Sequence, residues 1–151
     1  MVEPGDDAVE LLRLDDNVCA VVARLARNGA PFAGARLHDG VVEVRSSWVN
    51  VATPVDVLIG DDLDALAGWA ALLDAMEANE RDAGGAMSRS WPPEGRRGWL
   101  TLTDEDPYEV VVSDGGSSGV TVTVRLSLAE GWIEDARRRL AEARAVLLPQ
   151  A

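Results

Sequence analysis

Alternating apolar and polar residues over the first sixty positions predict β-strands separated by turns. Asp15-Asp16-Asn17 has the composition of a tight turn and stands between two runs rich in valine and leucine, so we expect an opening hairpin. Residues 27–36, rich in glycine, alanine and proline, are predicted to form a loop. Pro54 marks a strand start, an edge or a bulge, because proline cannot donate a hydrogen bond to a neighbouring strand. The strands expected in this part of the chain cover residues 9–14, 18–25, 41–51 and 55–59.

After residue 60 the apolar residues recur at intervals of three and four, which is the spacing of one helix face. Gly60-Asp61-Asp62 offers an N-cap and an acidic first turn, so we predict a helix from about Asp62 to Asn79. Trp69 lies beside the apolar stripe and is expected in the core. The stripe consists of Leu63, Leu66, Ala70, Leu73 and Met76 or Glu77.

Three further strands and a second helix are predicted in the rest of the chain. The strands cover residues 99–103, 108–112 and 120–128, and the last of them alternates apolar with polar residues. The glycine-rich segment 113–119 is interpreted as a hairpin loop. The helix covers about residues 133–147, with a narrow apolar seam and with acidic residues placed to pair with arginines one turn later.

These elements predict an α+β fold with an antiparallel sheet of about six to seven strands and two helices packed on one face, in the order strands, helix, strands, helix. A single domain is expected over residues 1–151, since this length suits one domain. Residues 1–7 are expected to be a flexible N-terminus.

The segment 80–98 lacks periodicity and is rich in glycine, serine, proline and arginine. We predict a long internal loop here rather than a domain boundary, because the helix before it needs the later strands for its core. Trp91 stands in this loop with Arg89, Arg96 and Arg97 nearby, and an exposed tryptophan among arginines is typical of an interface anchor. These four are the candidate interface residues, and the alternative is that the loop packs back on its own sheet.

The formal net charge of −12 and the pI near 4.4 narrow the choice of partners. A negative field repels phosphate backbones and anionic lipid, so we expect no nucleic-acid or membrane binding. The charge suits either a basic protein partner or plain solubility. Residues 1–7 lack the basic and apolar regions of a secretory signal, and no apolar run approaches a membrane span in length. We therefore expect a cytoplasmic protein.

Residue types that carry catalysis are scarce. The chain has no lysine, one histidine (His38) and one cysteine (Cys19), so a histidine-dependent site can be built only around His38. The missing lysine is interpreted as a GC-rich coding bias. His38 and Asp39 are placed on a turn, where adjacent residues rarely hold the geometry of a general base. Cys19 is expected to be a buried structural thiol in a strand.

The acidic clusters fall in predicted turns or at helix starts, where solvation and capping explain them. Asp104-Glu105-Asp106, with Glu109, lacks the ligand spacing and the glycine of a calcium loop. Residues 115–119 resemble a phosphate-binding loop only in their glycines, because a strand follows them instead of a helix that starts with lysine. We therefore predict no catalytic, metal-binding or cofactor-binding residue, and no cofactor.

Several segments together resemble a small actinobacterial family known only as a domain of unknown function. The resemblance would cover residues 11–147 and implies the same fold class and a bacterial source, but it carries over no catalytic residue. The segments that carry it are Ser46-Ser47-Trp48-Val49-Asn50, Asp62-Leu63, Gly68-Trp69-Ala70, Leu73-Asp74-Ala75, Val112-Ser113-Asp114, residues 117–122 and Gly131-Trp132-Ile133, together with Leu126, Leu128 and Arg137.

The sequence favours a small acidic cytoplasmic protein-interaction module, immunity-, chaperone- or adaptor-like, over an enzyme. The outer face of the sheet or the Trp91 loop would meet a basic protein partner. The first alternative is an enzyme or small-ligand binder that uses carboxylates and arginines in a cleft between sheet and helices. The second is a homodimer with a structural role, suggested by the narrow apolar seam of the last helix.

Overall fold

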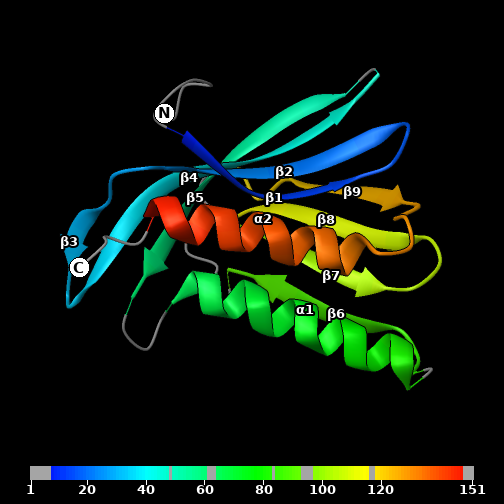
Figure 1. Cartoon of the computed structure of the whole chain (residues 1–151). Coiled ribbons are helices and arrows are strands. Elements are labelled where there is room, and N and C mark those ends of the chain that lie inside the picture. The colour runs from blue at the N-terminus through cyan, green and yellow to red at the C-terminus, as the bar shows by residue number, and fades with distance from the viewer. Residues whose placement is uncertain are drawn as a thin grey trace.

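A computed structural model describes residues 8–47, 49–60, 64–82, 84–92, 97–115 and 118–147. In these ranges nine strands and two helices form an α+β fold, with two antiparallel sheets and two helices side by side (Figure 1). The predictions for residues 1–7, Trp48 and Arg96 lie outside the described residues. No helix in the described part of the chain is long and apolar enough to span a membrane.

The elements follow one another as five strands, a helix, four strands and a helix. They are β1 (Ala8–Asp15), β2 (Cys19–Ala26), β3 (Ala30–Phe32), β4 (Ala35–Ser46), β5 (Asn50–Ile59), α1 (Ala65–Arg81), β6 (Met87–Trp91), β7 (Gly98–Asp104), β8 (Tyr108–Asp114), β9 (Thr121–Leu126) and α2 (Trp132–Leu147).

The first sheet is built around the long strand β4. One side of β4 pairs with β2 and β3, and its other side pairs with β5 over ten residue pairs. The predicted opening hairpin is confirmed, because β1 and β2 pair from Ala8–Ala26 to Asp15–Ala20. The prediction of a loop over residues 27–36 is wrong in part, since the short strand β3 lies within it. All three residues of β3 are exposed, so no apolar alternation marks the strand.

The second sheet has the order β6-β7-β8-β9. The prediction of one sheet with six to seven strands is therefore corrected to two sheets with nine strands among the described residues. The two sheets approach closely at Gly98, the first residue of β7. A Cβ atom on Gly98 would lie 2.6 Å from the carbonyl oxygen of Pro54 in β5, so this contact requires glycine.

The prediction of a loop over residues 80–98 is also wrong in part. α1 continues to Arg81, and β6 occupies Met87–Trp91 as the edge strand of the second sheet. Hydroxyl pairs join β6 to β7 on the exposed face, Ser88 with Thr103 at 2.7 Å and Ser90 with Thr101 at 2.9 Å. The sheet thus takes up the polar residues that the sequence analysis interpreted as loop.

Trp91 is fully buried, so the expectation of an exposed tryptophan is wrong. Its ring packs edge to face against Trp69 of α1, with ring centroids 6.2 Å apart. Its indole Nε1 donates a 2.9 Å hydrogen bond to the carbonyl oxygen of Ala65 in the first turn of that helix. The alternative reading, in which the segment packs back on its own sheet, holds for Trp91.

The two helices bury the faces that the periodicity predicts. α1 starts at Ala65 rather than near Asp62, because Asp64 is the N-cap and its carboxylate accepts from the backbone N–H of Leu66 and of Ala67. α2 lies beside α1 and packs on β1 (Figure 1). The buried seam of α2 consists, as predicted, of Ile133, Ala136, Leu140, Ala143 and Leu147. These side chains belong to one apolar core that extends over both sheets and both helices.

Candidate functional site: an acidic groove

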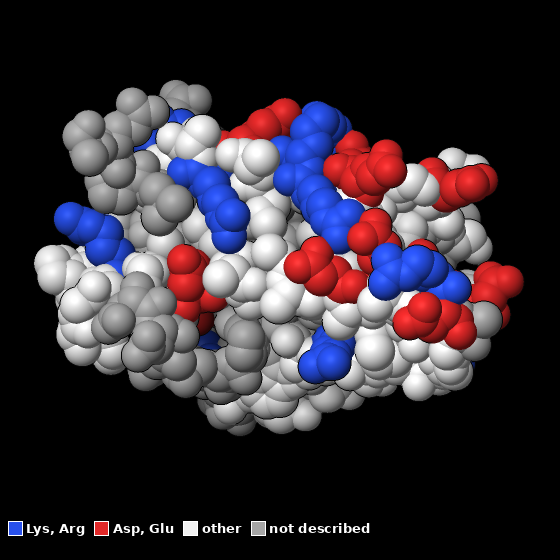
Figure 2. Space-filling model, turned by 60° about the horizontal axis from the view of Figure 1, so that its bottom comes forward, with Lys and Arg blue, Asp and Glu red and all other residues white. Residues whose placement is uncertain are grey.

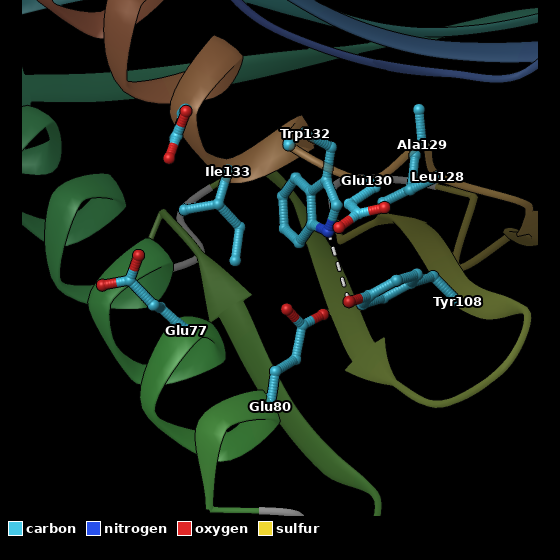
Figure 3. A pocket seen from close by; sticks show the side chains of 10 residues that line it. Glu77, Glu80, Tyr108, Leu128, Ala129, Glu130, Trp132 and Ile133 are labelled. Atoms are coloured by element: carbon cyan, nitrogen blue, oxygen red, sulfur yellow. Dashed lines mark hydrogen bonds between the residues drawn. The ribbon is translucent and has the colours of Figure 1, made fainter.

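A hollow of about 420 Å³ opens where the end of α1, the start of β8 and the start of α2 meet (Figure 3). Four glutamates and two aromatic residues lie around it: Glu77, Glu80, Glu130, Glu134, Tyr108 and Trp132. They come from three parts of the chain that are far apart in sequence. The hollow therefore exists only once α1, the start of β8 and α2 have come together.

Tyr108 and Trp132 form the aromatic wall of this hollow. Their rings pack edge to face with centroids 5.3 Å apart, and the Trp132 Nε1 donates a 3.2 Å hydrogen bond to the Tyr108 hydroxyl (Figure 3). Gly131, immediately before α2, has a φ of 86°, a left-handed conformation that glycine adopts without strain. This glycine turns the chain into the helix and so places Trp132 opposite Tyr108.

Glu80 points from the last turns of α1 toward this aromatic pair (Figure 3). Burial raises the pKa of the Glu80 carboxyl, and the negative charge of Asp104 raises it further, while an interaction with Trp132 acts in the opposite direction. Burial and a like charge both make the ionised form of Glu80 costly. A cation placed in the hollow would relieve both costs.

A second hollow of about 480 Å³ continues from the first and shares Glu80, Tyr108 and Leu128 with it. Asp104, Glu105 and Asp106, at the turn between β7 and β8, line this part. We call the two hollows together the acidic groove. Among the described residues that line it there is no arginine.

Two neighbouring contacts fix the shape of the acidic groove. The Asn79 amide donates to the Asp104 carboxylate at 2.9 Å and to the Gly85 carbonyl at 3.1 Å, which holds the β7 end against α1. At the other rim Arg137 of α2 donates to Glu77 at 2.9 Å and to Asp74 at 2.8 Å. The hydrogen bond from Arg137 lowers the pKa of Glu77, so Glu77 is already neutralised by an internal partner.

The chemistry of the acidic groove is that of cation binding. Carboxylates attract ammonium and guanidinium groups, and the faces of tyrosine and tryptophan add a favourable cation–π contribution. Neither His38 nor Cys19 lines the acidic groove, so its walls offer no nitrogen or sulfur nucleophile. No group of three or more histidine, cysteine, aspartate or glutamate side chains in the described ranges is arranged to hold a metal ion.

Of the candidate interface residues from the sequence, Arg89, Trp91 and Arg97 do not line the acidic groove. Arg89 is exposed on β6, Trp91 is buried, and Arg97 donates a 3.1 Å hydrogen bond to Asp56 of β5. Arg96 lies outside the described residues. An interface role for the exposed arginines stays a prediction, whereas Trp91 provides no exposed anchor.

His38 lies in the middle of β4, not on a turn, and only 1% of its surface is exposed. Its Nδ1 lies 2.7 Å from the carbonyl oxygen of Ala26. Cys19 begins β2 and is half-buried against the core rather than fully buried. Burial raises the pKa of the Cys19 thiol, which keeps the thiol protonated and unreactive.

The sequence pattern alone does not indicate the acidic groove. The sequence pattern places Tyr108 at a strand start, Trp132 in the core beside the stripe of the last helix, and Asp104–Asp106 in a solvated turn. One signal could have linked them, because a hairpin between β7 and β8 places the 104–106 turn beside the first residue of β8. The approach of Glu80 depends on tertiary docking of α1 and has no local signal.

A family model described as "Family of unknown function (DUF5959)" matches residues 9–148. No curated protein and no solved structure matches the chain.

Proposed function

We propose that this chain, which belongs to the DUF5959 family, is a cytoplasmic protein-interaction module whose acidic groove binds a basic segment of a partner protein. One observation carries the proposal: carboxylates surround the Tyr108–Trp132 pair, and no arginine of the described chain lines the groove. This refines the expectation from the sequence, which assigned the contact to the outer sheet face or to the Trp91 loop. An immunity, chaperone or adaptor role would each fit such a module.

Electrostatics supports a basic partner in two ways. The net charge of −12 steers a cationic segment toward the protein over a distance of about 10 Å at moderate salt. Within the acidic groove, desolvation and the charge of Asp104 raise the pKa of the Glu80 carboxyl, so a guanidinium or ammonium group placed there would offset an existing electrostatic cost. Long-range attraction and local binding thus favour the same ligand charge.

The aromatic pair supports a peptide side chain rather than a bare ion. The Trp132 Nε1 already bonds to the Tyr108 hydroxyl, and both rings are only partly buried, so a ligand would contact the ring surface that stays exposed. An arginine side chain can stack its planar guanidinium on such a ring and also donate to a carboxylate. A hydrated metal ion gains little from the aromatic faces.

The test uses a short fluorescein-labelled peptide of alternating arginine and glycine, with a peptide of glutamate and glycine as the negative probe. Fluorescence anisotropy should show saturable binding of the arginine peptide alone, weakened as salt is added. The double variant Glu80→Gln and Glu130→Gln should weaken binding by about tenfold, or about 1.4 kcal/mol.

The matched control removes two exposed carboxylates elsewhere, Asp82→Asn and Glu142→Gln, whose side chains are 73% and 66% exposed. Both double variants change the net charge by the same amount. Equal loss of affinity in the two would show that only the overall charge matters and would defeat the groove proposal.

A second candidate, an enzyme or small-ligand binder, is favoured by the raised pKa of Glu80, because a general acid near neutral pH needs such a shift. Free arginine or an alkylamine is the matching probe. If these compounds bind as tightly as the peptide and Glu80→Gln abolishes their binding, a small-ligand site replaces the peptide-binding site as the function of the groove.

A further inference from the structure

Another hollow, lined by arginines instead of carboxylates and called here the arginine hollow, lies at the far end of α2. The acidic groove is at the start of this 16-residue helix, and the arginine hollow is at its last residues. At 1.5 Å per residue the helix separates them by about 24 Å. It has a volume of about 290 Å³ and is lined by Arg27, Asn28, Gly29, Arg36, His38 and the end of α2. No aspartate or glutamate of the described chain lines it.

Arg27 and Arg36 differ from most arginines of this protein in having no carboxylate partner among the described residues. Arg36 donates instead to the carbonyl oxygen of Gly29 at 2.8 Å. On the face drawn in Figure 2, blue side chains on the right lie directly against red ones, as the printed ion pairs of most arginines lead one to expect. In a chain with nearly twice as many acidic as basic residues, two unpaired guanidinium groups around one hollow are unexpected.

His38 stands behind the two arginines and has an unpartnered buried nitrogen. Because the Ala26 carbonyl can only accept, the Nδ1 of His38 donates to it. Nε2 is buried and has no hydrogen-bond partner. A Cβ atom on Gly29 would lie 2.6 Å from Nε2, so the glycine closes over the ring and supplies the backbone that Arg36 holds.

A further hollow of about 340 Å³ adjoins the arginine hollow and shares Arg36, His38 and Leu147 with it. The rest of its lining is largely apolar and includes Pro31, Ala35 and Ile59. A ligand that spans the two hollows would meet guanidinium groups at one end and aliphatic side chains at the other.

We infer that Arg27 and Arg36 form a binding site for a carboxylate that carries an apolar group, with the carboxylate between the guanidiniums and the apolar part against Ile59 and Leu147. Planar guanidinium groups match a carboxylate with two parallel hydrogen bonds. This site is independent of the acidic groove. The ligand is either a free aliphatic acid or the C-terminal carboxylate of a peptide with an apolar last residue.

The end of α2 offers a competing explanation for the arginines. A helix C-terminus carries partial negative charge, and arginines near it stabilise the helix without any ligand. That role predicts a loss of stability on substitution but no response to added carboxylate. The experiment therefore measures both quantities.

The probes are hexanoate, its neutral amide, and an N-acetylated alanine-leucine-leucine peptide with either a free or an amidated C-terminus. Binding to the full chain is followed by calorimetry and by backbone amide shifts. We expect one of the two free carboxylates, but neither amide, to bind saturably, with shifts at Asn28, Gly29 and Gly34. Hexanoate binding identifies a free acid as the source, and binding of the peptide alone identifies a peptide terminus.

Arg27→Gln and Arg36→Gln should each weaken this binding by about tenfold. The control is Arg89→Gln, which removes another exposed arginine without a carboxylate partner among the described residues and should leave the affinity unchanged. Circular dichroism melts of each variant report whether it folds.

Three outcomes would overturn the site. The first is that neither carboxylate binds at millimolar concentration, and the second is that both arginine variants lower the melting temperature but bind like the parent protein. The third is binding seen only after removal of residues 148–151, which would assign the arginines to the end of this chain.

Discussion

Glu77 and Glu80 lie one turn apart on α1, yet the pKa values of their carboxyl groups move in opposite directions. A hydrogen bond from Arg137 lowers the pKa of Glu77, whereas burial and the charge of Asp104 raise the pKa of Glu80. The first glutamate thus ties the two helices together, and the second faces the acidic groove. Docking of α2 on α1 thus gives different roles to two glutamates that look alike in the sequence.

The substitution Glu80→Gln should increase the stability of the protein at neutral pH. A carboxyl whose pKa is raised on folding binds its proton more tightly in the folded state, so its contribution is favourable at low pH and is lost as pH rises through the folded-state pKa. Thermal melts of parent and variant should therefore coincide at low pH and diverge above the ordinary glutamate pKa of 4.5.

The substitution Glu77→Gln should give the reverse dependence and serves as the matched comparison. Its lowered pKa contributes stability at neutral pH that is lost as pH falls through the folded-state value. The variant should melt earlier than the parent at neutral pH and should approach it in acid. If the melting temperatures of the two variants changed with pH in the same way relative to the parent, the opposite pKa shifts of Glu77 and Glu80 would be contradicted.

The helices and the fold class were predictable because their signals are local and strong. Both helices show apolar residues at regular intervals over several turns. The seam from Ile133 to Leu147 is buried as expected, and so is the stripe from Leu66 to Met76 apart from the half-buried Ala70. The predicted start of α1 differs from the observed start because three aspartates stand close together, and the sequence does not show which of them caps the helix. β3 and β6 were missed because each is short and mostly exposed, so the pattern of burial could not reveal them.

Neither the burial of Trp91 nor the acidic groove was predictable from the same signals. Trp91 stands between serine and two prolines, a loop-like context, and its burial depends on a distant contact with Trp69. The alternation of Ser88 and Ser90 with Met87 and Trp91 was the available sign of a strand. The acidic groove joins residues from α1, the β7–β8 turn and α2, and only the tertiary structure brings these together.

The substitution Trp91→Phe tests the buried role of Trp91. Phenylalanine keeps most of the apolar volume but removes the Nε1 donor, so the bond to the Ala65 carbonyl is lost at the start of α1. We expect the free energy of unfolding to fall by about 1–3 kcal/mol in urea titrations. Arg89→Ala, at an exposed position two residues earlier in β6, should change it by less than about 0.5 kcal/mol. Equal effects would contradict the packing of this segment.

The substitution Asp64→Ala tests where α1 begins. Asp64 accepts from the backbone N–H groups of Leu66 and Ala67, and alanine cannot replace this cap. The expected loss of stability is about 1 kcal/mol, measured by urea unfolding. Asp64→Ser keeps an acceptor at the same position and should restore most of the loss. A neutral effect of alanine would move the helix start toward the aspartates predicted from the sequence.

The substitution Gly98→Ala tests how closely the two sheets approach. The added Cβ would lie 2.6 Å from the Pro54 carbonyl oxygen and 3.1 Å from a Thr53 methyl group, so β5 or β7 has to move. Because backbone cannot yield as easily as a side chain, we expect a loss of about 1–3 kcal/mol in unfolding free energy.

Gly85→Ala is the matched control for this substitution, since a Cβ there would have no atom within 4 Å and it should change stability by less than about 0.5 kcal/mol. Crowding at Gly98 displaces the junction of the sheets, whereas the acidic groove is built from α1, α2 and the far end of β7. A Gly98→Ala protein that remains folded should therefore still bind the arginine peptide with parental affinity. Loss of binding without loss of folding would show that the junction of the sheets and the acidic groove are coupled.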